Sequence, residues 1–225
     1  MMAWTCGSSF EPGSSHRSPH KRGGRKVPVW PVYLLGLLPP VWLLYQGITG
    51  GLGVDPVKVM EHQLGIWALQ LLLAGLCITP LMRFARLNLL KFRRAVVVLA
   101  FLYILLHLVV WLVLDIQLRW GEIWADIVKR PYITVGIAAF VLAIPFAATS
   151  WNGAVRRLGA TAWGRLHQLT YVIVLLGAVH FVMQEKVWTI ESLLYLGVGI
   201  GLVGLRLPKL VGRMRARSDQ NLTLG

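Results

Sequence analysis

The sequence predicts an all-α integral membrane protein, built as a bundle of six transmembrane helices. Hydrophobic residues make up 56% of the 225 residues, and the mean hydropathy of +0.63 is high for a soluble domain. The apolar residues gather in nearly continuous runs, each close to the roughly 20 helical residues that a bilayer core requires. Basic residues concentrate in alternate connecting segments, which is typical of membrane topology.

The chain opens on a polar segment that precedes six apolar runs. Residues 1–27 are rich in Ser, Gly, His, Arg and Lys and have no signal-peptide core, so we interpret them as a disordered basic leader. The apolar runs cover residues 29–48, 63–82, 95–115, 132–149, 166–184 and 187–205. We expect one helix from each run, within a single membrane domain over residues 28–210, and a basic cytoplasmic tail at residues 211–225.

Proline and glycine are expected to modify two of these helices. Pro39 and Pro40 should interrupt the first helix, and the glycines at 50, 51 and 53 should end it in a flexible outer turn. Pro145 should kink the fourth helix near its cytoplasmic end.

The charge pattern predicts an orientation. Most of the 23 Lys and Arg residues fall in the leader, the second–third loop, the fourth–fifth loop and the tail, so both termini are expected in the cytoplasm. The net charge of +14 then reflects topology rather than nucleic-acid binding. Charged residues avoid the middle of every run, which argues against a voltage sensor or a carboxylate-based proton pump.

Three histidines lie within the apolar runs: His107 in the third, and His167 and His180 in the fifth. A titratable ring in hydrocarbon is costly and indicates a functional site, and imidazole is a common axial ligand of haem iron. At 1.5 Å per residue, His107 lies about 18 Å from the cytoplasmic start of its helix, and His180 about 20 Å beyond His167. Depth therefore favours a haem between His107 and His180 in the outer half of the membrane, with His167 at a second, inner level.

The position of His167 leaves alternatives open. On a straight helix, thirteen residues at about 100° each leave roughly 220° between the directions of His167 and His180. Either that helix is distorted or the two rings face different neighbours. At the inner level the third helix offers Arg93 instead of a histidine, so a haem there needs another ligand or an open position. A lone intramembrane histidine can also simply bond to a neighbouring helix.

Other residues receive plainer interpretations. His62, at the outer edge of the second run, is interpreted as a solvated interface residue, and tryptophans near the run ends as an interfacial belt. Gly177, three residues before His180, fits either room for a macrocycle or tight helix packing. Cys6 and Cys77 are too few for a disulfide framework.

Six short stretches resemble the MsrQ (YedZ) family in their order and spacing. They are residues 51–58 (GLGVDPVK), 78–81 (ITPL), 106–108 (LHL), 130–132 (RPY), 165–167 (RLH) and 179–181 (VHF). The resemblance covers about residues 29–215 and leaves out the leader. His107, His167 and His180 match the histidine positions of that family.

This resemblance implies a ferric reductase-like transmembrane domain that holds a b-type haem and an associated FMN. It implies an electron-transfer subunit, rather than a catalytic one, in the bacterial inner membrane. Electrons would come from the quinone pool or a cytosolic flavin reductase. They would pass to MsrP, a periplasmic molybdenum-containing enzyme that reduces methionine sulfoxide in oxidised envelope proteins. Inner-face arginines could pair with a flavin phosphate or simply with anionic lipid: Arg83, Arg86, Arg93, Arg94, Arg156 and Arg157.

Two other functions remain open at this point. A stand-alone ferric or quinone reductase would be an enzyme in its own right. A haem-free transporter or membrane scaffold would use none of the histidines as ligands, although the lack of mid-span charges and of matched halves disfavours transport. No nucleotide-binding domain follows the last basic cluster, so we expect a separate electron donor and a separate acceptor.

Overall fold

A computed structural model of the protein describes residues 28–85 and 89–206, so the predicted leader (1–27) and tail (211–225) lie outside the described residues. Every regular element in the described part is a helix, which confirms the all-α prediction. The helices are α1 (Trp30–Thr49), α2 (Pro56–Ala85), α3 (Leu90–Val109), η1 (Val110–Asp115), α4 (Trp120–Lys129), α5 (Pro131–Ala148), α6 (Asn152–Leu166), α7 (Leu169–Gln184) and α8 (Ile190–Gly204).

Five segments are long and apolar enough to cross a membrane, and the protein is a multi-pass membrane protein. They are Trp30–Thr49, Pro56–Met82, Lys91–Asp115, Pro131–Ala148 and Thr161–Gln184. Helix α8 is apolar but has only 15 residues. At 1.5 Å per residue it is about 22 Å long, less than the ~30 Å hydrocarbon core. A sixth crossing by α8 therefore stays a prediction.

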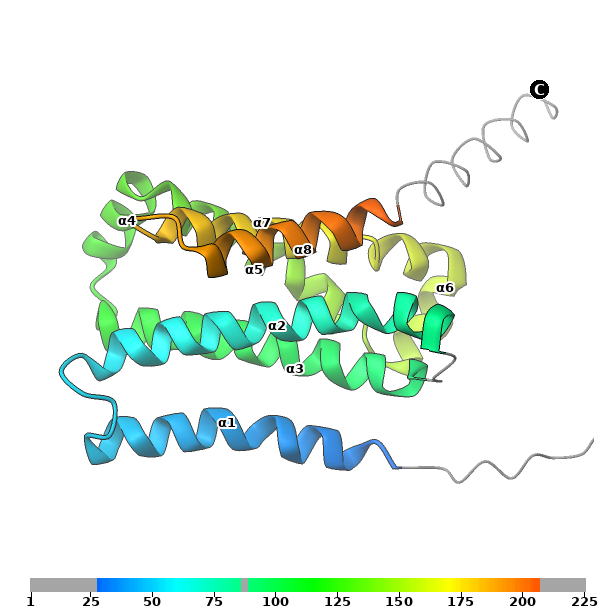
Figure 1. Cartoon of the computed structure of the whole chain (residues 1–225), viewed down its shortest axis with the longest axis horizontal. Coiled ribbons are helices and arrows are strands. Elements are labelled where there is room, and N and C mark those ends of the chain that lie inside the picture. Colours follow the sequence, from blue (N-terminus) through cyan, green and yellow to red (C-terminus); the bar gives the residue numbers. More distant parts are fainter. Residues whose placement is uncertain (1–27, 86–88, 207–225) are drawn as a thin grey trace, which may run out of the picture.

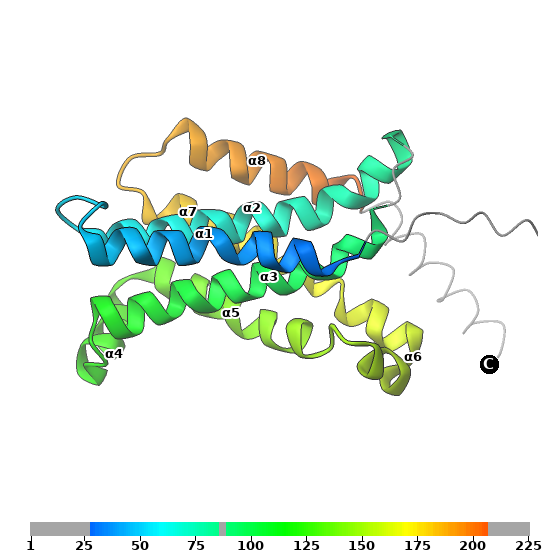
Figure 2. The same cartoon turned by 90° about the horizontal axis from the view of Figure 1, so that it is seen from below.

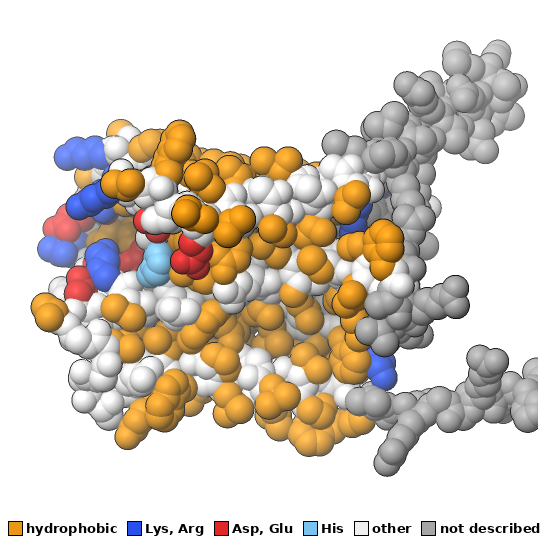
Figure 3. Space-filling model, viewed as in Figure 1, with side chains coloured by type: hydrophobic (Ala, Val, Ile, Leu, Met, Phe, Trp, Pro, Cys, Tyr) orange, Lys and Arg blue, Asp and Glu red, His pale blue; other side chains and the backbone are white. Residues whose placement is uncertain are grey.

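The helices form a bundle whose ends differ in charge. Helices α2 and α3 pack along each other, as do α5 and α7, while α8 packs on α7 and α1 lies along α2 and α3 (Figures 1 and 2). The short helices α4 and α6 lie at opposite ends of the bundle. We call the end that carries α4 the acidic end, because the described acidic residues lie there (Figure 3): Asp55, Glu61, Asp115, Glu122, Asp126, Glu185 and Glu191.

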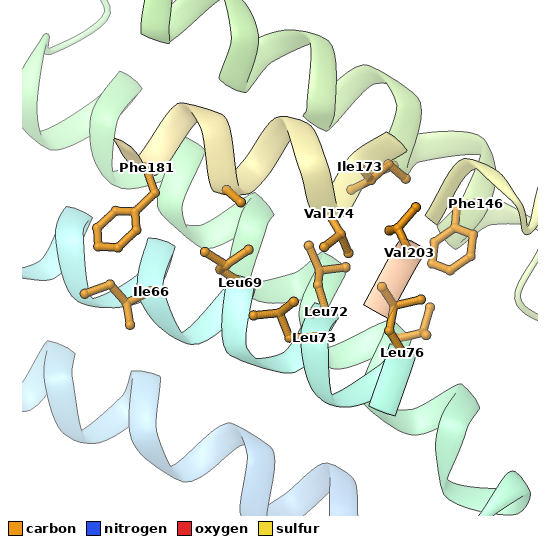
Figure 4. Close-up of a cluster of buried hydrophobic side chains, with 14 residues drawn as sticks. Ile66, Leu69, Leu72, Leu73, Leu76, Phe146, Ile173, Val174, Phe181 and Val203 are labelled. Atoms are coloured by element: carbon orange, nitrogen blue, oxygen red, sulfur yellow. The ribbon is translucent and has the colours of Figure 1, made fainter. Parts of the chain in front are cut away.

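The main core lies between α2 and α7. Leucines of α2 face Val174 and Phe181 of α7, and Phe146 of α5 and Val203 of α8 close the far end (Figure 4). The outer surface of the bundle is apolar as well, because large apolar side chains are exposed along α1, α5 and α8 (Figure 3). Lipid contact explains an apolar exterior of this extent.

The first helix continues through Pro39 and Pro40, so the predicted interruption was wrong. Pro40 has no N–H for the carbonyl of Gly36, which lies four residues earlier. The hydroxyl of Tyr103 on α3 donates to that carbonyl instead, at 2.7 Å. A neighbouring helix can thus satisfy a backbone group that proline frees. The same arrangement recurs at Pro80 in α2, where Arg206 donates to the carbonyl of Leu76 at 2.7 Å.

This arrangement makes a testable prediction about stability. Tyr103→Phe should lower the free energy of unfolding by about 1–3 kcal/mol, because it leaves the part-buried Gly36 carbonyl without its partner. In a Pro40→Ala background the backbone N–H at position 40 can bond to the Gly36 carbonyl, so Tyr103→Phe should lower the free energy of unfolding clearly less. Thermal unfolding of the four proteins in detergent gives this double-mutant cycle. Equal costs in the two backgrounds would contradict the explanation.

The fifth predicted run begins at a turn in the structure. Helix α6 ends at Leu166, His167 and Gln168 form a turn, and α7 begins at Leu169. His167 and His180 therefore do not share one straight helix, and of the two alternatives left open the structure shows the distorted helix. The third run also changes from one helix type to another, since α3 passes at Val110 into the π-helix η1, a form that occurs frequently at functional sites.

Candidate functional site

Two of the three predicted histidines meet at a cavity near the acidic end. His107 comes from the last turn of α3 and His180 from the last turns of α7. Their ring centroids are 6.2 Å apart, and the planes are nearly perpendicular at 83°. Their predicted depths put these rings at one level, and in the structure both rings line one cavity.

Each ring is tied to a backbone carbonyl of another helix. Nδ1 of His107 bonds to the carbonyl of Glu61 on α2 at 2.8 Å, and Nδ1 of His180 bonds to the carbonyl of Tyr132 on α5 at 2.6 Å. A carbonyl oxygen can only accept, so Nδ1 carries the proton in both rings. The neutral rings therefore keep a lone pair on Nε2, and in the described part of the chain no protein group bonds to either Nε2.

The cavity between these helices has a volume of about 1060 Å³. Its walls are mainly apolar and come from α2, α3, α5 and α7, and both histidines line it. Its mouth is polar and carries both signs of charge: Lys58, Glu61, Arg130, Glu185 and Lys186.

An ion-pair network ties the mouth of the cavity together. Lys58 at the start of α2 contacts Asp115 at the end of η1 at 2.7 Å and Glu61 at 3.4 Å. Glu61 also provides the carbonyl that holds His107. The network therefore links the two chain segments that flank the His107 ring.

The two rings suit a metal ion whose remaining ligands are supplied by a cofactor. An ion between two imidazoles sets their centres about 6 Å apart, given metal–nitrogen bonds of about 2 Å and roughly 1 Å to each ring centre. A ligating histidine usually donates its second N–H to a carbonyl or carboxylate, as both rings do here. Among the described residues no group of three or more His, Cys, Asp or Glu could hold a bare ion. Haem, with four ligands of its own, matches this pair and the apolar walls.

His167 stands apart from this cavity. Its ring lies in the turn between α6 and α7, 3.8 Å from the Trp163 ring and 4.6 Å from the Phe146 ring by centroid. Nε2 of His167 is buried and has no hydrogen-bond partner in the described structure. The structure thus brings together two of the three predicted ligands and leaves the third at the α6 end with an unsatisfied nitrogen.

Sequence reasoning missed several residues of the site. His62 lines the cavity and its ring packs on Phe181 at 5.7 Å, so its interpretation as a solvated interface residue was incomplete. The carbonyls of Glu61 and Tyr132 carry no side-chain signal. Glycines in otherwise bulky helices were the one available signal. The informative ones are Gly65 and Gly136, which face the histidine rings, and not Gly177, where an added Cβ would meet Leu69 at an ordinary 3.7 Å.

Comparison with known proteins agrees with the all-helical membrane fold. Residues 64–178 match a family model described as "Ferric reductase like transmembrane component", and this match spans α2 to α7. The fold and this match therefore define a ferric reductase-like membrane protein. No solved structure matches the chain.

Curated relatives place the chain more closely. It is 46% identical over 181 residues to a protein of Agrobacterium fabrum, which covers 80% of this chain and 84% of that protein. It is 48% identical over 178 residues to one of Rhizobium meliloti, covering 79% and 82%. Both are named "Protein-methionine-sulfoxide reductase heme-binding subunit MsrQ". The chain belongs to the MsrQ family.

Proposed function

We propose that the chain is a transmembrane b-type cytochrome that passes electrons across the bacterial inner membrane. The observation that carries this proposal is the pair His107 and His180. Each ring keeps Nε2 free at one cavity while a backbone carbonyl holds its Nδ1. The names of the curated relatives, which call those proteins heme-binding subunits, support the choice of haem.

A bound haem would supply reversible one-electron iron chemistry. The chain's own residues do the rest. His107 and His180 offer Nε2, and the carbonyls of Glu61 and Tyr132 fix the tautomer and the direction of the rings. The apolar walls keep water from the site, and burial of this kind tunes a reduction potential.

The electron route is part of the proposal. We place the acidic end on the periplasmic side, with both termini in the cytoplasm, as the charge pattern predicts. The His107–His180 pair then lies near the periplasmic acceptor, which we propose is MsrP, in support of the repair of oxidised envelope proteins. The quinone pool or a cytosolic flavin reductase would donate from the α6 end, where His167 lies.

FMN belongs to the proposal only through the family. At the α6 end a smaller cavity of about 490 Å³ is lined by Lys91, Arg94, Tyr33 and Trp151. Cations beside aromatic rings suit a flavin phosphate and its ring system, and this is where we would look for FMN. Of the arginines considered from the sequence, Arg94 lines this cavity, Arg157 lies over the Trp151 ring, and Arg86 lies outside the described residues.

The test of the proposed function starts with the purified full-length protein in detergent. Reduced-minus-oxidised visible spectra should show a b-type haem, and the pyridine haemochrome should quantify it. Addition of oxidised MsrP should then reoxidise the reduced protein. A preparation without haem would refute the cytochrome. Haem that MsrP leaves reduced would refute the electron route.

The ion-pair network yields a prediction about potential. Lys58→Met leaves two carboxylates without their cation beside the cavity. Negative charge favours oxidised iron, so the midpoint potential should fall. The fall should be modest, because the Lys58 side chain is 51% exposed and solvent screens the pairs. Potentiometric titration measures it. Lys129→Met, which removes the same charge from a residue that does not line the cavity, should leave the potential nearly unchanged.

A further inference from the structure

Both histidine rings meet the same backbone arrangement on a neighbouring helix. The carbonyl that holds His107 belongs to Glu61, and Gly65 lies four residues later on α2. The carbonyl that holds His180 belongs to Tyr132, and Gly136 lies four residues later on α5. In an α-helix the residue four positions later lies one turn along the same face. Each ring therefore lies against a carbonyl and the glycine next to it.

The space at these glycines is filled by the rings themselves. A Cβ at Gly136 would lie 2.8 Å from Nδ1 and 2.9 Å from Cε1 of His180. A Cβ at Gly65 would lie 3.3 Å from the corresponding atoms of His107. Both glycines have ordinary helical backbone, so the close ring approach, and not an unusual φ, is what a side chain would disturb.

We infer that Gly65 and Gly136 are positioning residues, which let the Nδ1–Cε1 edge of each imidazole approach the neighbouring helix and reach the carbonyl that fixes its tautomer and direction. The inference rests on the proposed function for its meaning, since the direction of Nε2 matters only if Nε2 binds iron. The two positions should differ in severity. A contact of 2.8 Å requires the His180 ring to move, whereas the 3.3 Å contact requires a few tenths of an ångström.

The test compares Gly136→Ala and Gly65→Ala with two matched glycine variants. Gly75→Ala on α2 and Gly199→Ala on α8 add the same methyl group, but their Cβ atoms would meet side chains at ordinary distances of 3.7 Å and 3.6 Å. All four variants gain helix propensity equally, so that effect cancels. Haem content, the midpoint potential and the ferric EPR spectrum are measured on full-length protein, because the EPR signal reports the strength and orientation of the axial ligands.

We expect Gly136→Ala to lower haem affinity roughly 10- to 100-fold, the range found when a group that orients a metal ligand is lost. Gly65→Ala should keep haem but change the EPR signal and the potential, and the two control variants should resemble the wild type. If Gly136→Ala keeps wild-type haem content, EPR signal and potential, the inference is wrong. A wild-type protein without haem would instead refute the proposed function, so the two failures are distinguishable.

A second measurement covers the case in which Gly136→Ala folds poorly. In a His180→Ala background the ring that the new methyl group would strike is gone. Gly136→Ala should therefore lower the melting temperature of the apoprotein in the wild-type background and not in the His180→Ala background. An equal loss in both backgrounds would show that Gly136 does not act through the His180 ring, and would overturn the inference.

Discussion

His107→Ala and His180→Ala should each abolish the same haem absorption component. The ring centroids lie 6.2 Å apart at one cavity, so a haem held by both rings would lose one of its two histidines in either variant. Reduced-minus-oxidised spectra and pyridine haemochrome quantification of each variant measure the loss. If the component survives in either variant, the pairing is wrong.

Exogenous imidazole separates loss of a ligand from loss of the fold. Each alanine variant leaves a hole of the size of the ring beside a carbonyl that still accepts a hydrogen bond. Imidazole added to the purified variant should enter this hole and restore part of the component. A variant that has merely unfolded will not respond, and its elution profile will show aggregation.

His167→Phe should keep the fold and the His107–His180 component, and should remove a second redox component at the α6 end. Phenylalanine preserves the ring contacts with Trp163 and Phe146. It also removes the buried Nε2 that has no hydrogen-bond partner, a burden of about 1–3 kcal/mol for a polar group of this kind. If His167 has no ligand role, the Phe variant should therefore be at least as stable and transfer electrons normally.

Two measurements decide between these outcomes for His167. Potentiometric titration counts the redox components in wild type and variant, and stopped-flow reduction by a donor added on the cytoplasmic side of inside-out vesicles gives the rate. A ligand at His167 requires the loss of one component and slower reduction. Unchanged titration and unchanged rates would remove His167 from the site and leave His107 and His180 as its only histidine ligands.

The sequence predicted the membrane-spanning segments well and their interruptions poorly. Five predicted runs correspond to segments long enough to span. The prolines at 39 and 40 misled because their effect depends on Tyr103, a residue more than 60 positions away. A distorted helix at His167 was one of two alternatives that the sequence left open, because residue spacing does not show where a helix bends. In the structure α6 ends at Leu166 and α7 begins at Leu169.

The site was predictable only in part, because it too depends on contacts between helices that are distant in the sequence. Depth along a helix follows from residue number, so His107 and His180 could be matched in level. The helix that receives each ring does not follow from residue number. Glu61 and Tyr132 contribute carbonyls, which every residue has, and Gly65 and Gly136 are identified only by the ring that each one faces.

The sequence by itself determined that the chain is helical and crosses the membrane several times, where each histidine lies along its segment, and the family to which the chain belongs. These properties depend on local composition, because the transfer of a segment into lipid is governed by its own residues. The tertiary structure alone decided which helix faces which, where the cavity lies and what holds each ring. Helices that are apolar on every side do not encode their rotation about their own axes, so packing against neighbours sets it. That rotation turns His107 and His180 into a facing pair, whereas the place of His167 at the α6 end follows from its position along the chain.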